Sequence, residues 1–325
     1  MSGFERTWVL VLAGGAAEWP ESLNGHDPCG ALLQPPSLLK MTLSRASVIG
    51  PPERTCVLVD RAQKRYSNGS LTRLSYGNLI VQPRYRGSAV EILLAVLTLA
   101  EHDPWARIVV LPAHHYVHNE AALASSLLDA ATPTAQTRNK LTLVGIKPED
   151  ADSQLSYIVP GRWFEDGTRS VHRIVHSPGK ASAHALWARG ALWNSSIVAA
   201  RAVVLLSVLR ARMPDLVDQM EMALARGDGS EVRADALTQL YARLPYVDFS
   251  QALSQGAEAE CRVIISRPCG WSDLGTPRRV AAVIRRLQLA DPRAYGRGCV
   301  GGGISPRRKT DPLTLRGSKP GEAHG

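Results

Sequence analysis

The chain has 325 residues, a formal net charge of +9 and 45% hydrophobic residues. This length is enough for one large α/β domain, and the composition is typical of a globular protein, which excludes a fibrous or wholly disordered chain. No apolar run is long enough to span a membrane, and Glu5 and Arg6 before the apolar stretch 8–13 argue against a secretory signal. The five cysteines are scattered and form no C-x-x-C pair, so we expect free thiols and a cytoplasmic location.

The first predicted element is a buried strand that ends on Gly14 and Gly15, because residues 7–13 form an apolar run rich in β-branched side chains. A glycine turn lets the backbone approach a phosphate and direct N–H groups at it. The alternative is an ordinary turn from strand to loop. The segment is neither a P-loop nor a dinucleotide fingerprint, because it lacks both glycine spacings.

Apolar strands alternate with helices over the first half of the chain. Strands are predicted at 56–59, 79–81, 108–111 and 141–144, and helices at 37–46, 89–100 and 119–131. This alternation predicts an α/β fold with a mostly parallel, Rossmann-like sheet that carries helices on both faces. Ligands of such sheets bind beyond the carboxyl ends of the strands. Gly14-Gly15, residues 83–89 and residues 112–116 follow strands in this way, so we expect them to share one cleft.

The second half contains further short strands and several helices. Strands are predicted at 156–159, 171–175, 193–199 and 261–266, and helices at 180–190, 201–212, 214–226, 232–243 and 276–288. Residues 1–290 are expected to form one domain. Residues 291–325 hold seven Arg or Lys residues against three acids and few apolar side chains, which predicts a disordered, basic tail. A solvated tail is favoured over one that binds nucleic acid or a membrane.

Six short motifs occur in the order found in one family of enzymes. They are Leu12-Ala13-Gly14-Gly15 with Trp19-Pro20, Gln82-Pro83 through Ala89, Leu111-Pro112-Ala113-His114-His115, Gly145-Ile146-Lys147-Pro148, Tyr157-Ile158 with Pro160-Gly161, and Gly270-Trp271-Ser272-Asp273-Leu274-Gly275. Leu192-Trp193-Asn194-Ser195 is also kept. Across residues 7–287 the chain resembles the sugar-nucleotide pyrophosphorylases, in particular the mannose-1-phosphate guanylyltransferases.

The resemblance implies a nucleotide-diphospho-sugar transferase fold and the conversion of GTP and mannose-1-phosphate into GDP-mannose and pyrophosphate. It implies that Gly14, Gly15 and His115 bind the nucleotide, and that Arg86 and Asp273 are catalytic. Tyr157, Asn194 and Lys147 would contact the sugar phosphate, and Asp273 with His114 would hold Mg²⁺. The implied partners are therefore GTP and a sugar-1-phosphate, with neither a membrane nor nucleic acid expected, and a homo-oligomer stays open.

Several charged positions depart from the family. The Arg of the opening motif is absent, the phosphate-binding Lys looks like Cys29, the first metal Asp is His114, and the Glu-Lys-Pro string reads His176-Ser177-Pro178. Magnesium prefers oxygen ligands, so His114, His115 and His118 are either ligands of a softer metal such as zinc or exposed side chains at the cleft mouth.

Two further alternatives follow from these departures. Asp273 is either a metal ligand or the cap of the helix that begins near Thr276. The chain is either an active enzyme, in which Arg84 or Lys40 replaces a lost cation, or a catalytically impaired homologue that binds a nucleotide-sugar or a partner protein.

Overall fold

A computed structural model describes residues 6–15, 33, 35–61, 78–132, 139–225 and 230–291. Trp19, Pro20, Cys29 and the predicted tail beyond Asp291 lie outside these residues, so the expectations for them stay predictions. Among the described helices, none combines the length and the apolar character that crossing a membrane requires.

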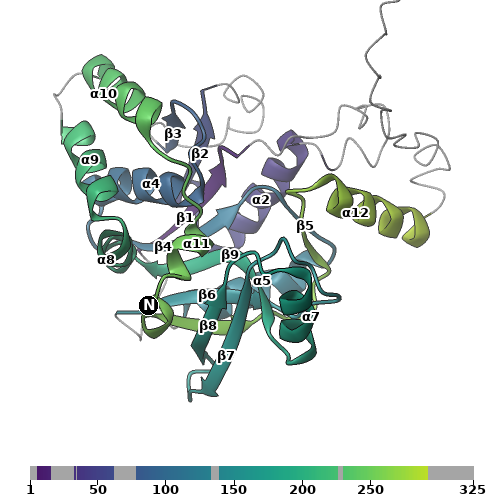
Figure 1. Ribbon diagram of the computed structural model, residues 1–325. Helices are drawn as coiled ribbons and strands as arrows, with labels where there is room; N and C mark the ends of the chain where they lie inside the picture. Colours follow the sequence, from purple (N-terminus) through teal and green to yellow (C-terminus); the bar gives the residue numbers. More distant parts are fainter. Residues whose placement is uncertain are drawn as a thin grey trace, which may run out of the picture.

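Nine strands form one mixed sheet through the centre of the domain (Figure 1). Their spatial order is β3-β2-β1-β4-β9-β6-β10-β8-β7. The bounds are β1 (Thr7–Ala13), β2 (Thr55–Asp60), β3 (Leu79–Gln82), β4 (Arg107–Pro112), β6 (Leu141–Ile146), β7 (Tyr157–Trp163), β8 (Arg169–Val175), β9 (Leu192–Arg201) and β10 (Cys261–Ile265). β8 and β9 run against the other strands of this sheet. The predicted mostly parallel α/β sheet is therefore confirmed, and the antiparallel insertion of β9 between β4 and β6 is new.

Both faces of the central strands β1, β2 and β4 are buried, as a continuous apolar strand pattern requires. Along β1, Leu10 and Leu12 pack into one hydrophobic cluster and Val9 and Val11 into the opposite one, because successive side chains of a strand point to opposite faces. The first cluster lies under α4, α8, α9 and α10, and the second under α2, α5 and α7. Helices thus cover both faces (Figure 1).

The helices agree with the predicted segments, with ends that differ by a few residues. Their bounds are α2 (Pro35–Ile49), α4 (Ser88–His102), α5 (Glu120–Ala131), α7 (Lys180–Ala188), α8 (Ala202–Arg212), α9 (Pro214–Ala225), α10 (Ser230–Arg243), α11 (Phe249–Leu253) and α12 (Pro277–Ala290). The short helix α11 was not predicted, because five residues carry too little periodicity to distinguish it from a turn.

A small antiparallel ribbon joins two remote parts of the chain beside the main sheet. It consists of β5 (His115–Val117) and β11 (Trp271–Asp273), and its register pairs Asp273 with His115. Helix α12 follows β11 and packs Val280, Val283 and Leu287 into a third apolar cluster. The ribbon fixes the position of the start of α12 relative to the end of β4.

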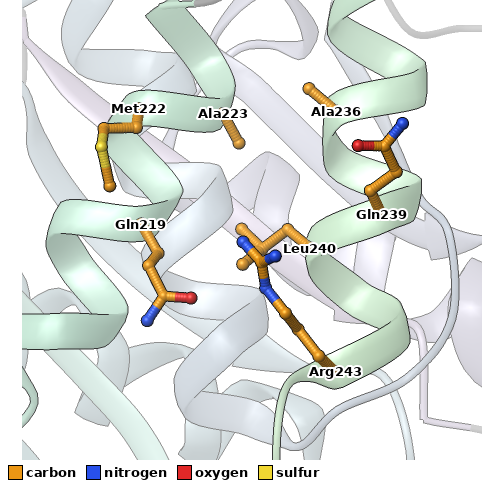
Figure 2. Close-up of a pocket in the computed structure, with 7 residues that line it drawn as sticks. All are labelled: Gln219, Met222, Ala223, Ala236, Gln239, Leu240 and Arg243. Carbon is orange, nitrogen blue, oxygen red and sulfur yellow. The ribbon is translucent and has the colours of Figure 1, made fainter.

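The space between α9 and α10 is a shallow hollow that we call the helix groove (Figure 2). Its lining residues are Gln219, Met222 and Ala223 of α9 and Ala236, Gln239, Leu240 and Arg243 of α10. Met222 is 58% exposed there, whereas Leu240 is buried. The groove is built by two neighbouring helices alone.

Candidate active site

A cleft of about 210 Å³ opens beyond the carboxyl ends of β1 and β4. Five parts of the chain line it: the ends of β1 and β4, residues 85–92, residues 246–249, and the segment from β11 into α12, with Ser196 of β9 adding a sixth. The strand-end argument predicts that Gly14, Pro112 and Asp273 converge. Pro112 and Asp273 lie in this one lining, together with Gly15 in place of Gly14. The shared cleft therefore follows from the topology of the sheet.

Gly14 lies at the floor of the cleft, where no side chain fits. A Cβ atom built on Gly14 would lie 2.1 Å from Glu91 Oε1 and 2.2 Å from Gln82 Nε2. The Gly14 N–H is hydrogen-bonded to the Glu91 carboxyl group. Gly14 thus supports a buried side-chain cluster, and it is the next residue, Gly15, that lines the cleft.

That cluster holds two carboxyl groups around one amide. Gln82 Nε2 donates to Asp60 Oδ1 at 2.6 Å and to Glu91 Oε1 at 2.9 Å. Burial raises the pKa of Asp60 to about 6. Burial, together with the neighbouring Asp60 carboxylate, raises the pKa of Glu91 to about 8. Glu91 also lines the cleft, so near neutral pH a protonated carboxyl group faces it.

Asp273 is the most strongly paired carboxylate of the cleft. Arg279 Nη2 lies 2.9 Å from Asp273 Oδ1, and His114 Nε2 lies 3.4 Å from Asp273 Oδ2. The Gly275 N–H also donates to Oδ1, at 2.7 Å. Although burial alone would raise the pKa of Asp273, His114 and Arg279 hold it well below its ordinary value. The carboxylate is therefore ionised and already has a cationic partner in Arg279.

The cap of α12 is Thr276, whose hydroxyl accepts a hydrogen bond from the Arg279 N–H. Asp273 lies three residues earlier and bonds the loop at Gly275. The alternative in which Asp273 caps this helix is therefore wrong. Its carboxylate is free of that structural role and belongs to the cleft.

His114, His115 and His118 do not form one cluster of candidate metal ligands. His114 and His115 offer ring nitrogens that lie, with an Asp273 oxygen, within 4.8 Å of one another. His118 instead lines a separate hollow beside Arg286 and Leu287. His115 is buried, and burial lowers its pKa well below the ordinary value, so its ring is neutral. Among the described residues, His115 Nε2 has no hydrogen-bond partner.

Arg86 binds the end of helix α10 and does not line the cleft. Its Nε donates to the Tyr241 carbonyl at 2.9 Å and its Nη2 to the Ala242 carbonyl at 3.3 Å. Both carbonyls belong to the last turn of α10, which a cation stabilises. Arg86 does not appear in the lining of the cleft. The geometry thus argues against a catalytic Arg86, because its guanidinium is engaged by α10. The sequence motif could not reveal this contact, since Tyr241 lies 155 residues away along the chain.

The three predicted sugar-contacting residues have different surroundings. Tyr157 is fully buried, and its hydroxyl accepts a hydrogen bond from the Asp152 N–H at 3.0 Å, which argues against contact with a ligand. Asn194 Oδ1 accepts from the Ser196 N–H at 3.1 Å and so supports a cleft residue without lining the cleft. Lys147 is exposed after β6, and its role stays a prediction.

Several cleft residues were not predicted from the sequence. Tyr85 and Tyr246 meet edge to face with ring centroids 5.8 Å apart. Asp248 lies 3.7 Å from the ring of His176 (Oδ1 to Nδ1), and it accepts a hydrogen bond from Ser88 Oγ at 2.8 Å. Tyr85 and Ser88 lie within the motif at residues 82–89, whereas no motif marks Tyr246 or Asp248. Their one local signal is the polar residue Asp248 directly before a short apolar segment, which is typical of a helix cap.

The residues present do not fit magnesium. Mg²⁺ requires oxygen ligands in near-octahedral geometry, whereas two of the three candidate ligands are imidazoles. The single carboxylate, Asp273, already binds Arg279 and the Gly275 N–H through one oxygen and lies beside His114 through the other. The expectation of Mg²⁺ at Asp273 and His114 therefore has no support in the donor set.

Comparisons with known proteins agree with this architecture, although the chain matches no protein-family profile. A mannose-1-phosphate guanylyltransferase of Escherichia coli is 30% identical over 83% of the chain, and a xanthan biosynthesis protein of Xanthomonas campestris is 28% identical over 82%. The chain spans 58% and 57% of the lengths of these two relatives.

A solved structure described as a mannose-1-phosphate geranyltransferase from Thermus thermophilus superimposes with a TM-score of 0.71. It is 26% identical, and the match covers 87% of this chain and 79% of the other. Sequence and three-dimensional arrangement thus agree over nearly the whole described domain: the chain is similar in sequence to mannose-1-phosphate guanylyltransferases and has the fold of this solved structure.

Proposed function

We propose that the chain is a nucleotidyltransferase of the mannose-1-phosphate guanylyltransferase type, whose cleft binds GTP and a sugar-1-phosphate. The observation that carries this proposal is the convergence of Gly15, Pro112 and Asp273 on one cleft at the carboxyl ends of the strands. Relatives named for this activity support it. The three described cysteines are free thiols, which supports a reducing compartment such as the cytoplasm.

In the proposed reaction, a phosphate oxygen of the sugar-1-phosphate attacks the α-phosphorus of GTP. The bond from that phosphorus to the bridging oxygen of the β-phosphate breaks, and pyrophosphate leaves with the negative charge. Such a transfer depends on alignment and on cations beside the phosphates. We assign these tasks to the backbone of Gly15 and to the side chains of Arg279 and His114, which line the cleft.

The altered charges favour slow turnover. Removal of one charge-assisted contact to a transferring group typically costs about 10²–10³ in rate. Arg86 binds the end of α10, and His114 stands where the family has a carboxylate. The same observation favours the second candidate, a homologue that binds the nucleotide or the nucleotide-sugar without converting it.

Nucleotidyl transfer by the purified full chain separates the two candidates. GTP and mannose-1-phosphate are incubated with the protein, with and without Mg²⁺ or Mn²⁺, and GDP-mannose is measured by chromatography. Binding of GTP is measured in parallel by calorimetry. Slow transfer, below about 1 s⁻¹, supports the enzyme. Binding with no product supports the second candidate, and absence of both binding and product contradicts the proposed function.

A further inference from the structure

We propose that the guanidinium of Arg279 replaces the divalent cation in this cleft, so that an anionic nucleotide binds without a metal ion. The inference rests on the proposed function for the nature of the ligand, a nucleotide phosphate. The pairing of Asp273 with Arg279 is observed directly and does not depend on that function.

Arg279 is held in place on three sides. Its Nη2 lies 2.9 Å from Asp273 Oδ1, and its Nε donates to the Asp273 carbonyl oxygen at 2.7 Å. Its Nη1 lies 3.3 Å from Asp152 Oδ2. The side chain is mostly buried, at 13% exposed, so these contacts fix one geometry. The guanidinium is a permanent charge, because Arg does not lose its proton in proteins.

The position of Arg279 relates this charge to the cleft. Arg279 lines the cleft together with Gly15, His114 and Asp273. It also lines a second hollow, toward Asp152 and Trp193, so it lies in the wall between the two. Its charge is therefore next to the space in which a ligand would bind, rather than on the outer surface of α12.

The contacts of Asp273 leave little room for a bound cation. Arg279 lies between two carboxylates, 2.9 Å from Asp273 Oδ1 and 3.3 Å from Asp152 Oδ2. The His114 imidazole lies 3.4 Å from the other oxygen of Asp273. A divalent ion at Asp273 would meet the guanidinium in a partly buried setting, where like charges repel strongly. Arg279 is also the one Arg or Lys among the described residues that line the cleft, and its planar guanidinium is a suitable partner for a phosphate.

The first test compares GDP binding to the full chain by calorimetry in EDTA and in excess Mg²⁺. The proposal expects the two dissociation constants to agree within about threefold, because the cation site is already filled by Arg279. Arg279→Ala should weaken binding in EDTA by about tenfold or more. Arg278→Ala is the matched control, since it removes the same charge from the preceding, exposed residue of α12 and should change little.

The second test asks for a gain of metal binding, which a misfolded variant would not produce. Electron paramagnetic resonance measures Mn²⁺ bound to the wild type and to the double variant His114→Asp with Arg279→Ala. The double variant offers two carboxylates and no guanidinium, so it should bind Mn²⁺ at least about tenfold more tightly than the wild type. Arg279→Lys keeps the charge without the fork and should not bind Mn²⁺.

Two results would overturn the proposal. One is wild-type protein that binds Mn²⁺ as tightly as the double variant and loses it in Asp273→Asn. The other is GDP binding that needs Mg²⁺ in the wild type. If no guanine nucleotide binds under either condition, the proposed function fails instead, and the Mn²⁺ comparison still decides for or against the role of Arg279.

Discussion

The cleft beside Asp273 and the helix groove between α9 and α10 differ in how many parts of the chain build them. The cleft joins segments from residue 12 to residue 279 and contains Glu91, His114, Asp248, Asp273 and Arg279. The helix groove joins two consecutive helices, and its one ionisable lining residue among those described is Arg243 (Figure 2). A hollow between neighbouring helices follows from their packing, whereas a convergence of charges requires distant segments to meet.

The difference shows where charged side chains are paired. Arg279 binds Asp273, and Gln82 bridges Asp60 and Glu91. His114, which departs from the motif that the chain resembles, lies beside Asp273 in the same cleft. The cleft is thus a stable arrangement of its own, and substitutions in it should have larger and more specific effects than substitutions in the groove.

The largest loss of stability is expected for Asp273→Asn. The change leaves the cation of Arg279 without its closest carboxylate, and removal of one partner of a buried pair costs roughly 3 kcal/mol of unfolding free energy. Chemical denaturation at pH 7 measures this loss. Because partner charges depress the pKa of Asp273, its stabilisation is present above about pH 3.8, its ordinary pKa, and fades at lower pH.

The control is Asp218→Asn on α9, which breaks an exposed pair with Arg210 beside the helix groove. Exposed pairs contribute at most about 1 kcal/mol. Equal losses for Asp218→Asn and Asp273→Asn would remove the distinction between the two regions.

A pH-dependent effect of similar size is expected for Glu91→Gln. The native state holds a proton on Glu91 between its ordinary pKa of 4.5 and about 8, a range in which the unfolded chain has released it. Wild-type stability therefore falls as the pH rises through this window, by up to a few kcal/mol. The amide cannot ionise, so the variant should be the more stable protein at pH 9.

Thermal unfolding between pH 5 and pH 9 measures the slope of stability against pH. Glu101→Gln, at the exposed end of the same helix, is the control and should keep the wild-type slope. An unchanged slope in Glu91→Gln would show that Glu91 is ionised in the native cleft.

A smaller loss, about 1–3 kcal/mol, is expected for Gly14→Ala. Its new methyl group would meet Glu91 and Gln82 at little more than 2 Å, and neither side chain is free to move because each is hydrogen-bonded. Gly15→Ala is the matched variant, since its methyl group would lie 3.2 Å from the Tyr85 ring at the more open side. Denaturant midpoints should rank Gly14→Ala below Gly15→Ala, and the reverse order would contradict the tight floor of the cleft.

Arg86→Ala should cost about 1–2 kcal/mol and leave nucleotide affinity within about twofold of the wild type. The reason is that Arg86 bonds the last turn of α10, which forms one side of the helix groove, rather than the cleft. Calorimetry with GTP and a denaturation curve test both parts. A loss of GTP affinity without a loss of unfolding free energy would show that Arg86 contacts the nucleotide.

The smallest effect is expected for Met222→Ala in the helix groove. Met222 is 58% exposed, so its removal should change the unfolding free energy by less than about 0.5 kcal/mol and leave nucleotide binding unaltered. A measurable change in nucleotide affinity would mean that the groove and the cleft are coupled.

The sequence alone determined the layout of the domain. Apolar runs of three to seven residues that alternate with helical periods predict the strands and helices, and the rule that ligands bind at the carboxyl ends of parallel strands predicts the cleft. Gly14, Pro112 and Asp273 were placed together on that ground, and in the structure Pro112 and Asp273 line the cleft with Gly15, the residue after Gly14. These features depend on local patterns and on topology, which a single sequence carries.

The tertiary structure alone decided which charges meet. Arg86 resembles a catalytic residue in its motif, yet it binds carbonyls of α10 that lie 155 and 156 residues away. Asp60 and Glu91 belong to different elements and share one amide donor of Gln82. Arg279 lies six residues after Asp273, and it reaches that carboxylate because β11 pairs with β5 and fixes the start of α12. Long, charged side chains contact residues that are distant in the sequence, and neither periodicity nor motif spacing predicts those contacts.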